Sequence, residues 1–318
     1  MASAVDDIVA GSATTPAQVG AFLMGLCVKG ETVDEIVGAA RVLRARALRI
    51  HPRAEVLLDT CGTGGDGAGT LNISTAAAFV CAAAGVRIAK HGNRAMSGKV
   101  GGADVLEALG VRIDLEPQRV EACIDEVGIG FLFAQTFHPA MKQVAAPRRE
   151  LGVRTIFNLL GPLANPAGAT HQLVGVFAAR WLEPVAVALG RLGAKRALVV
   201  HGRDGTDEIS LSAATAVAEL SDGRVCTREI EPEEFGFRRC DIGVLRVADA
   251  AESARKIREL LSGESGPLSD VVALNAGAAL YAAECVPSMA EGIVRARGIL
   301  KEGRAANVLA ALAEFTQR

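Results

Sequence analysis

Residues 56–94 read VLLDTCGTGGDGAGTLNISTAAAFVCAAAGVRIAKHGNR. Two short apolar runs, VLLD (56–59) and VRIAK (86–90), predict strands, and the alanine-rich segment between them predicts a helix over 75–84. A strand, a helix and a second strand in this order are typical of two parallel strands joined by a crossover helix. The stretch therefore predicts an α/β domain built on a parallel sheet.

The same alternation continues toward the C-terminus. Short apolar runs predict further strands at GFLF (130–133), QLVGVF (172–177) and ALVVHG (197–202). Helical patterns occur between and after these runs, over residues 103–109, 183–192, 248–261, 268–283 and 288–318. We therefore expect a larger α/β domain with a central, mostly parallel sheet, followed by consecutive helices.

The first 48 residues have a different, helical pattern. Thr15-Pro16-Ala17-Gln18 is a capping box with proline at the first helical position, and apolar residues follow at helical spacing. Thr32-Val33-Asp34-Glu35 repeats the capping signal and predicts a second helix, which ends before His51-Pro52. These residues predict a small all-helical N-terminal domain.

Composition excludes several classes of function. The 318 residues carry 34 Lys and Arg against 36 Asp and Glu, a formal charge of −2, so no positive excess favours nucleic acid. The longest apolar run, residues 76–86, is shorter than the ~20 residues that span a bilayer, and Asp6 and Asp7 lie where a signal peptide is basic. The seven cysteines form no C-x-x-C pair, as is typical of reduced thiols. We expect a cytoplasmic protein with no nucleic-acid or membrane partner.

A glycine-rich segment, residues 60–70, separates the first predicted strand from its helix. Glycines let backbone N–H groups approach a phosphate, and a helix N-terminus favours negative charge there. Residues 62–67 match the G-x-G-x-x-G dinucleotide fingerprint, but the segment is too long for that tight turn, and the next strand ends in Lys90-His91 where an acidic residue is needed. The segment therefore predicts another kind of phosphate site, in which Asp66 requires a nearby cation. A flexible surface turn is the alternative.

Polar and cationic residues follow the second predicted strand, in KHGNRAMSGK (90–99). The carboxyl ends of parallel strands are where open α/β sheets bind ligands. Lys90 and Lys99 could neutralise a phosphate, Ser97 could donate to it, and Asn93 could both donate and accept. A solvated loop is the alternative for each residue alone, and the density of polar groups favours a ligand site.

An acidic pair, Asp207-Glu208, lies in HGRDGTDE (201–208) after another predicted strand. One or two carboxylates that act together with substrate phosphates are typical of Mg²⁺ sites. The five histidines, in contrast, lack the helical spacing of zinc ligands. The pattern predicts a magnesium site, with an acidic turn as the alternative.

An arginine pair, Arg148-Arg149, precedes the apolar segment FNLLGPLANP (157–166). A helical arginine beside such a segment could bind a carboxylate at a hinge between domains. A surface helix followed by a turn is an equally good interpretation of these residues alone.

Six motifs together resemble the anthranilate phosphoribosyltransferase family, which acts in tryptophan biosynthesis. They are GTGGD (62–66), NIST (72–75), KHGNR (90–94), ADVLEALG (103–110), FNLLGPLANP (157–166) and HGRDGTDE (201–208). The resemblance implies a small helical domain, residues 1–48 plus 142–156, hinged to an α/β domain, residues 49–141 plus 157–318. It also implies a homodimer formed through the helical domain.

The resemblance further implies roles for individual residues. Residues that would bind phosphoribosyl pyrophosphate (PRPP) are Gly62, Gly64, Gly65, Asp66, Thr70, Asn72, Ser74, Thr75, Lys90, Arg94, Ala95, Met96, Ser97 and Gly98. Residues that would line the anthranilate site are Gly62, His91, Asn93, His138, Arg148, Gly161 and Pro162. Mg²⁺ would be held by Ser74, Asp207 and Glu208.

The implied reaction is displacement at C1 of PRPP by the amine of anthranilate, which gives N-(5-phosphoribosyl)anthranilate and pyrophosphate. An aryl amine is neutral at pH 7, so the site needs positioning and stabilisation of the departing charge rather than a nucleophilic side chain. Lys90, Asn93 and Arg148 would be the main contributors. Two alternatives are a pyrimidine nucleoside phosphorylase-like enzyme, which would use free phosphate without a metal, and a non-catalytic relative that binds nucleic acid.

Overall fold

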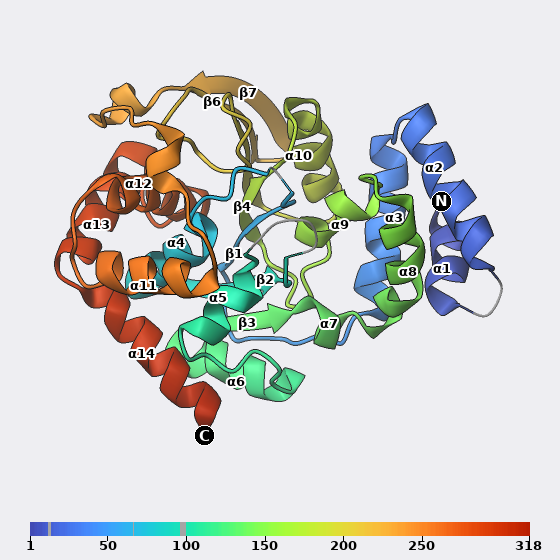
Figure 1. Ribbon diagram of the computed structural model, residues 1–318, viewed down its shortest axis with the longest axis horizontal. Helices are drawn as coiled ribbons and strands as arrows, with labels where there is room; N and C mark the ends of the chain where they lie inside the picture. Colours follow the sequence, from blue (N-terminus) through green and yellow to red (C-terminus); the bar gives the residue numbers. More distant parts are fainter. Residues whose placement is uncertain (12–13, 66, 96–99) are drawn as a thin grey trace.

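The computed structural model describes residues 1–11, 14–65, 67–95 and 100–318, and these residues form a seven-stranded sheet with helices around it (Figure 1). The strands are β1 (Leu57–Gly62), β2 (Arg87–Gly92), β3 (Ile129–Phe133), β4 (His171–Gly175), β5 (Arg196–Gly202), β6 (Thr215–Ser221) and β7 (Arg224–Ile230). The first five are parallel, whereas β6 and β7 are antiparallel to their neighbours. The predicted α/β class with a mostly parallel sheet is therefore confirmed.

The strand order is β3-β2-β1-β4-β5-β6-β7. After β1 the chain adds β2 and β3 on one side, and it then crosses to add β4 and β5 on the other side. Open α/β sheets bind ligands outside the carboxyl ends of the strands at such a reversal. The ends of β1 and β4, where Gly62 pairs with Gly175, therefore mark the expected site.

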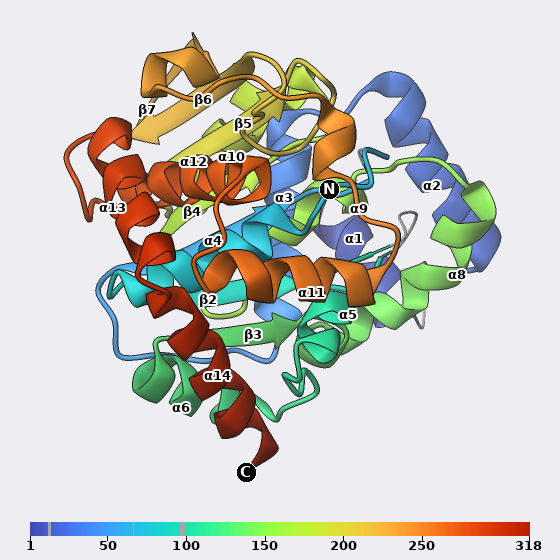
Figure 2. The same cartoon turned by 60° about the vertical axis from the view of Figure 1, so that its left-hand side comes forward.

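Helices cover both faces of the sheet, and Figure 2 shows α4, α11 and α12 on one of them. This face carries α4 (Ile73–Ala83), α5 (Gly102–Ala108), α11 (Ala250–Leu261), α12 (Pro267–Ala282), α13 (Met289–Lys301) and α14 (Arg304–Gln317). The other carries α6 (Pro117–Val127), α7 (Ala134–Phe137), α9 (Phe157–Leu163) and α10 (Leu182–Arg191). Successive strand residues point to opposite faces of the sheet. Leu58 therefore packs in the core beneath α4 and α12, whereas Leu57 and Cys61 pack beneath the helices on the other face.

Helices α1 (Ala2–Ala10), α2 (Pro16–Lys29), α3 (Val33–Arg46) and α8 (Lys142–Leu151) pack together at one end of the molecule (Figure 1). The predicted capping boxes of Thr15 with Gln18 and of Thr32 with Glu35 are both present. The division of the chain into two hinged domains stays a prediction. Within the described ranges, no helix has the length and apolar character of a membrane span.

Parts of the chain differ from the pattern-based expectation. The helical stretch predicted over 288–318 is two helices, because Gly303 adopts a left-handed φ of 68° between α13 and α14. The prediction also lacked α6, β6 and β7. Most residues of β7 are exposed, so its sequence lacks the apolar alternation that identifies a strand. Short 3₁₀ helices lie at Pro139–Met141, Ala179–Trp181, Pro232–Phe235 and Ile242–Leu245.

Candidate active site

The glycine-rich loop begins at the carboxyl end of β1. It is hydrogen-bonded to the end of the neighbouring strand β4, where the strand order reverses. The Thr63 N–H donates to the Gly175 oxygen at 2.9 Å. Gly64 and Gly65 have φ angles of 66° and 74°, in the left-handed region that favours glycine. The loop backbone is therefore held at the sheet edge. Asp66, a predicted PRPP residue, lies outside the described residues.

Asp207 lies over the ends of β1 and β4. A Cβ atom on Gly62 would clash with the Asp207 carboxylate, and one on Gly175 would clash with the Asp207 backbone oxygen. Glycine at both strand ends therefore permits this approach. The Gly64 N–H donates to Asp207 Oδ2 at 2.7 Å. The structure thus places a predicted metal ligand directly against the glycine-rich loop.

Glu208 faces the N-terminus of α4. Its Oε1 accepts a hydrogen bond from the Ser74 N–H at 3.2 Å, although the two residues are 134 positions apart in the sequence. N–H groups in the first turn of a helix favour a nearby anion. The structure therefore brings the loop, the start of α4 and the acidic pair to one edge of the sheet.

Lys90 is buried below the start of α4, with 4% of its surface exposed. Its Nζ donates to the Thr60 oxygen at 2.6 Å and to Ser74 Oγ at 3.3 Å. Burial lowers the pKa of Lys90, and the nearby Asp59 carboxylate counteracts this shift. Lys90 therefore lies beneath a helix start that favours anions.

His91 and His138 lie together on the side predicted to bind anthranilate, with ring centroids 5.1 Å apart. Burial lowers the pKa of His91 to about 3 and that of His138 to about 4, so both rings are neutral at pH 7. The neutral His91 ring donates from Nδ1 to the Gly161 oxygen at 3.0 Å. Nε2 of each ring is buried without a hydrogen-bond partner in the part of the chain that the structure describes. A bound molecule with N–H groups could satisfy these atoms.

Arg148 is half-buried on α8, whereas Arg149 beside it is exposed. The Arg148 guanidinium stacks on the ring of Phe157 at 5.6 Å from its centroid, and burial lowers the pKa of Arg148. Phe157 begins α9, which also carries Gly161 and Pro162. The structure thus brings Arg148 to the helix that holds two other predicted anthranilate residues.

Arg94 makes contacts within the protein that differ from its predicted phosphate contact. Its guanidinium pairs with Asp104 at 3.0 Å and Glu107 at 2.5 Å, both on α5. The Ala95 N–H also donates to Asp104, and Asn93 Oδ1 accepts from the Arg94 N–H at 2.8 Å. The role of Arg94 in PRPP binding stays a prediction. Outside the described residues lie Met96, Ser97 and Gly98.

The remaining predicted PRPP residues surround the start of α4. Thr70 forms an isolated β-bridge with Arg246, and Asn72 Oδ1 accepts from Ser253 Oγ at 3.0 Å. Thr75 is buried in the first turn of α4. These contacts hold the C-terminal part of the loop against the helices that follow the sheet.

Comparison with known proteins places the chain in a family. The model "Glycosyl transferase family, a/b domain" matches residues 54–306, and the model "Glycosyl transferase family, helical bundle domain" matches residues 1–47. Anthranilate phosphoribosyltransferase of Thioalkalivibrio sulfidiphilus is 57% identical over 314 residues, which cover 99% of this chain and 93% of that protein. This chain belongs to the anthranilate phosphoribosyltransferase family.

Solved structures of the anthranilate phosphoribosyltransferase family share the whole fold. The structure from Thermus thermophilus has a TM-score of 0.95 at 47% identity, and covers 100% of this chain and 94% of that one. The Saccharomyces cerevisiae protein in complex with PRPP and Mg has a TM-score of 0.88 at 26% identity, covering 98% of this chain and 90% of that one. The same yeast protein was also solved in complex with 4-fluoroanthranilate, with a TM-score of 0.90 at 26% identity over 99% and 92% of the two chains. The resemblance seen in the six motifs is therefore confirmed.

The anthranilate phosphoribosyltransferase fold of this chain offers oxygen donors at the predicted metal site. Ser74, Asp207 and Glu208 supply a hydroxyl and two carboxylates, which are donors that suit Mg²⁺. Among the residues the structure describes, no group of three or more His, Cys, Asp or Glu side chains is arranged to hold a metal. The donor set therefore fits an ion that completes its coordination with substrate oxygens and water.

Asp59 is a buried residue of this family site that the sequence analysis did not single out. Its carboxylate accepts from Asn165 Nδ2 at 2.8 Å and from the His91 N–H at 3.1 Å. Its surface is fully buried, and burial raises the pKa of Asp59 to about 6. The available signal was a carboxylate inside the apolar run VLLD (56–59), because a charge in a buried strand needs partners.

Arg154 is a second residue that the sequence analysis missed. Its guanidinium donates to the Gly65 oxygen and stacks on Phe177, 4.4 Å from the ring centroid. Its backbone oxygen accepts from Cys27 Sγ on α2 at 2.9 Å. Arg154 therefore connects a helix of the N-terminal part to the glycine-rich loop. No local pattern distinguishes it from a surface arginine.

Proposed function

We propose that this protein transfers the phosphoribosyl group of PRPP to the amine of anthranilate, giving N-(5-phosphoribosyl)anthranilate and pyrophosphate in tryptophan biosynthesis. The observation that carries the proposal is the meeting of the glycine-rich loop, the N-terminus of α4 and the Asp207-Glu208 pair at the strand reversal. The 57% identity to an anthranilate phosphoribosyltransferase over 99% of the chain supports the same substrates.

The donor half of the site would hold PRPP at the carboxyl edge of β1. Backbone N–H groups of the loop and of the first turn of α4 would bind the pyrophosphate, because both present donors to an anion. The buried Lys90 ammonium would attract the pyrophosphate from beneath the start of α4, and this attraction is stronger in a low-dielectric site than in water. These groups would stabilise the negative charge on the departing pyrophosphate.

Ser74, Asp207 and Glu208 would hold Mg²⁺ beside the loop. When bound, Mg²⁺ would supply positive charge that neutralises oxygens of the pyrophosphate. The presence of PRPP and Mg in a yeast relative of the same fold supports this assignment.

The acceptor half would lie between α8, α9 and the end of β2. Arg148 would hold the anthranilate carboxylate by two parallel hydrogen bonds, since a guanidinium matches a carboxylate in geometry. The neutral rings of His91 and His138 would accept hydrogen bonds at their buried Nε2 atoms, and Asn93 would help to orient the amine.

The reaction needs one bond to form and one to break. The amine nitrogen bonds to C1 as the C1–O bond breaks, the electron pair leaves with pyrophosphate, and the nitrogen then loses a proton. Because an aryl amine is neutral at pH 7, the protein contributes mainly by holding nitrogen and C1 together and by stabilising the leaving charge.

We also infer a cytoplasmic homodimer formed through the helical part, residues 1–48 plus 142–156, which we treat as one domain hinged to the rest of the chain. Met24 and Val28 on α2 are 41% and 77% exposed, and an exposed apolar helix face favours association. All seven cysteines are free, as expected in a reducing compartment.

The direct test is an assay of the purified protein with PRPP, Mg²⁺ and anthranilate, in which loss of anthranilate fluorescence and release of pyrophosphate are followed together. We expect turnover only when all three are present. A folded protein that leaves anthranilate fluorescence unchanged would contradict the proposal. Cleavage of pyrimidine nucleosides by free phosphate without Mg²⁺ would favour the phosphorylase alternative.

A further inference from the structure

The segment between β5 and β6, residues 203–214, carries Asp207 and Glu208 without regular secondary structure. Two carboxylates on an irregular segment need other contacts to keep them in one place, because restricting a flexible backbone costs conformational entropy. The structure shows such contacts at both ends of the acidic pair.

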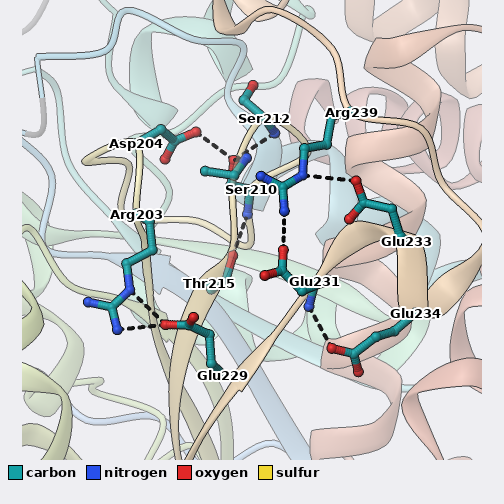
Figure 3. A network of polar contacts seen from close by, with 11 residues as sticks. Arg203, Asp204, Ser210, Ser212, Thr215, Glu229, Glu231, Glu233, Glu234 and Arg239 are labelled. Atoms are coloured by element: carbon teal, nitrogen blue, oxygen red, sulfur yellow. Dashed lines mark hydrogen bonds and ion pairs between the residues drawn. The ribbon is translucent and has the colours of Figure 1, made fainter.

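The first set of contacts lies within the segment and at the first residue of β6, and Figure 3 shows Asp204, Ser210, Ser212 and Thr215 among them. Asp204 accepts hydrogen bonds from Thr206 Oγ1 at 2.8 Å and from Ser210 Oγ at 2.5 Å. Ser210 Oγ in turn accepts from the Ser212 N–H at 2.8 Å, and the Ser210 N–H donates to Thr215 Oγ1 at 2.9 Å. These hydrogen bonds hold the segment in a compact turn against Thr215, the first residue of β6.

The second contact comes from a different part of the chain. Asn275, on α12, is fully buried and holds both backbone groups of Ile209, the residue after Glu208. Its Oδ1 accepts from the Ile209 N–H at 3.0 Å, and its Nδ2 donates to the Ile209 oxygen at 2.9 Å. Nδ2 also donates to the Val271 oxygen at 2.9 Å, one turn earlier in α12.

Asn275 is a polar side chain in an otherwise apolar stretch of α12, since Val271, Val272, Leu274 and Ala276 belong to the core. Burying an amide side chain costs free energy unless its hydrogen bonds are made. The folded state therefore favours a backbone position of Ile209 that keeps both hydrogen bonds to Asn275. Helix α12 packs on α4, whose Ser74 N–H binds the Glu208 carboxylate. Asn275 therefore fixes Glu208 relative to the helix start that Glu208 faces.

We propose that Asn275 is a positioning residue for Glu208, which it holds in place for the metal by clamping the backbone of Ile209. This inference rests on the proposed function, in which Glu208 is a magnesium ligand. Groups that orient metal ligands typically change metal affinity about 10- to 100-fold when they are removed. Because the Asp204 network holds the segment independently, loss of Asn275 should loosen Glu208 without unfolding the segment.

The test measures binding of Mn²⁺, as a probe for Mg²⁺, to the whole protein in the presence of PRPP by electron paramagnetic resonance. For Asn275→Ala we expect the Kd for Mn²⁺ to rise about tenfold. The KM for Mg²⁺ should rise in parallel, and kcat at saturating Mg²⁺ should recover to within about twofold of the wild-type value. A merely structural role would lower stability without this selective change in metal affinity.

Two further variants make the outcome decisive. Asn275→Ser is the substitute if Asn275→Ala does not fold. Its hydroxyl can donate to the Val271 oxygen but is too short to reach Ile209, so the Kd for Mn²⁺ should rise by a similar factor. Thr316→Val is the matched control. Thr316 is also a buried polar residue, but its Oγ1 accepts a hydrogen bond from the Arg112 N–H at 3.1 Å, far in the sequence from the acidic segment. It should lose stability and keep the wild-type Kd for Mn²⁺.

An Mn²⁺ affinity within twofold of wild type in the folded Asn275 variants would overturn the inference, as would an equal shift in Thr316→Val. A wild-type protein that binds Mn²⁺ with PRPP but does not convert anthranilate would contradict the proposed function alone. A wild-type protein that does not bind Mn²⁺ with PRPP would overturn the inference about Asn275.

Discussion

Lys90 and Asp59 are buried charges of opposite sign beneath the glycine-rich loop, with 4% and 0% of their surfaces exposed. Taking a charge out of water is costly unless another charge or hydrogen bonds compensate for it. The Asp59 carboxylate counteracts the desolvation that lowers the pKa of Lys90, and the Thr60 oxygen accepts a hydrogen bond from its ammonium. Asp59 and the Thr60 oxygen thus stabilise the positive charge of Lys90 beside the proposed anion site before any substrate binds.

Arg148 gives the clearest test at the residue scale. Truncating one partner of a desolvated charge pair costs about 2–5 kcal/mol, so Arg148→Ala should lower kcat/KM for anthranilate by about 30-fold or more. The Kd for PRPP should scarcely change, because the Arg148 guanidinium lies over Phe157 at the start of α9, on the proposed anthranilate side. Steady-state kinetics with each substrate varied, together with calorimetry of PRPP binding, would check both parts.

Arg149→Ala is the control for this prediction. Arg149 is the adjacent residue on α8 and is exposed, whereas Arg148 is half-buried. We expect less than a twofold change in kcat/KM for the control, because a solvated arginine loses no partner on truncation. Two silent variants would show that the anthranilate carboxylate binds elsewhere.

At the scale of elements, α12 and α13 approach each other at two glycines, Gly277 and Gly292. A Cβ atom on Gly277 would lie 2.5 Å from the backbone nitrogen of Ile293 and 2.7 Å from its Cα. Because Gly277 follows Asn275 by two residues, this close packing also fixes the part of α12 that clamps the acidic segment. The glycines therefore serve the site indirectly, by fixing the helix whose Asn275 bonds to Ile209 beside Glu208.

Gly277→Ala should lower the free energy of unfolding by about 1–3 kcal/mol, because the added methyl group meets backbone atoms that cannot move independently. Gly298→Ala, within α13, is the matched control, since nothing lies within 4 Å of a Cβ there. It should raise stability by up to about 1 kcal/mol, as alanine favours a helix over glycine. Urea denaturation would measure both, and a loss in the control equal to that of Gly277→Ala would contradict the packing argument.

At the scale of the whole molecule, burial of His91 and His138 makes stability depend on pH. Their pKa values are lowered from 6.5 to about 3 and about 4, so below about pH 6.5 the unfolded chain binds protons that the folded protein excludes. Stability is therefore lost as the pH falls from 6.5 toward these values. Asp59, with its pKa raised from 3.8 to about 6, opposes the loss by about 1 kcal/mol at pH 5.5 and by more at lower pH, because the folded state protonates it first.

We expect the free energy of unfolding to be about 2 kcal/mol lower at pH 5.5 than at pH 7.5 from these two histidines less the opposing effect of Asp59, and lower still because burial also lowers the pKa of His171. Urea denaturation at the two pH values would measure this. Replacing His138 by glutamine should reduce the difference by about 1 kcal/mol, since one buried imidazole then no longer contributes. A stability that stays constant or rises toward pH 5.5 would contradict this account of the site.

Much of the fold is encoded locally and could be predicted. The capping boxes at Thr15 and Thr32 depend on residues three positions apart, and the apolar runs of β1 to β5 are continuous in the sequence. The single stretch predicted over 288–318 divides at Gly303, and β7 was missed because its exposed residues carry no alternation. Local periodicity thus identifies the continuous apolar runs of the parallel strands and loses β7, whereas β6 and α6 were not predicted although both bury apolar side chains.

Short-range propensities and contiguous motifs encode the class of the fold, the family and the candidate ligand-bearing segments, so these could be predicted from the chain alone. How those segments meet is visible only in the folded chain: Asp207 contacts Gly64 across 143 positions, and Asn275 contacts Ile209 across 66. The fold also buries Asp59 and Lys90 together and turns Arg148 inward while Arg149 stays exposed. Burial and hydrogen-bond partners arise from the packing of distant segments, and no local spacing specifies that packing.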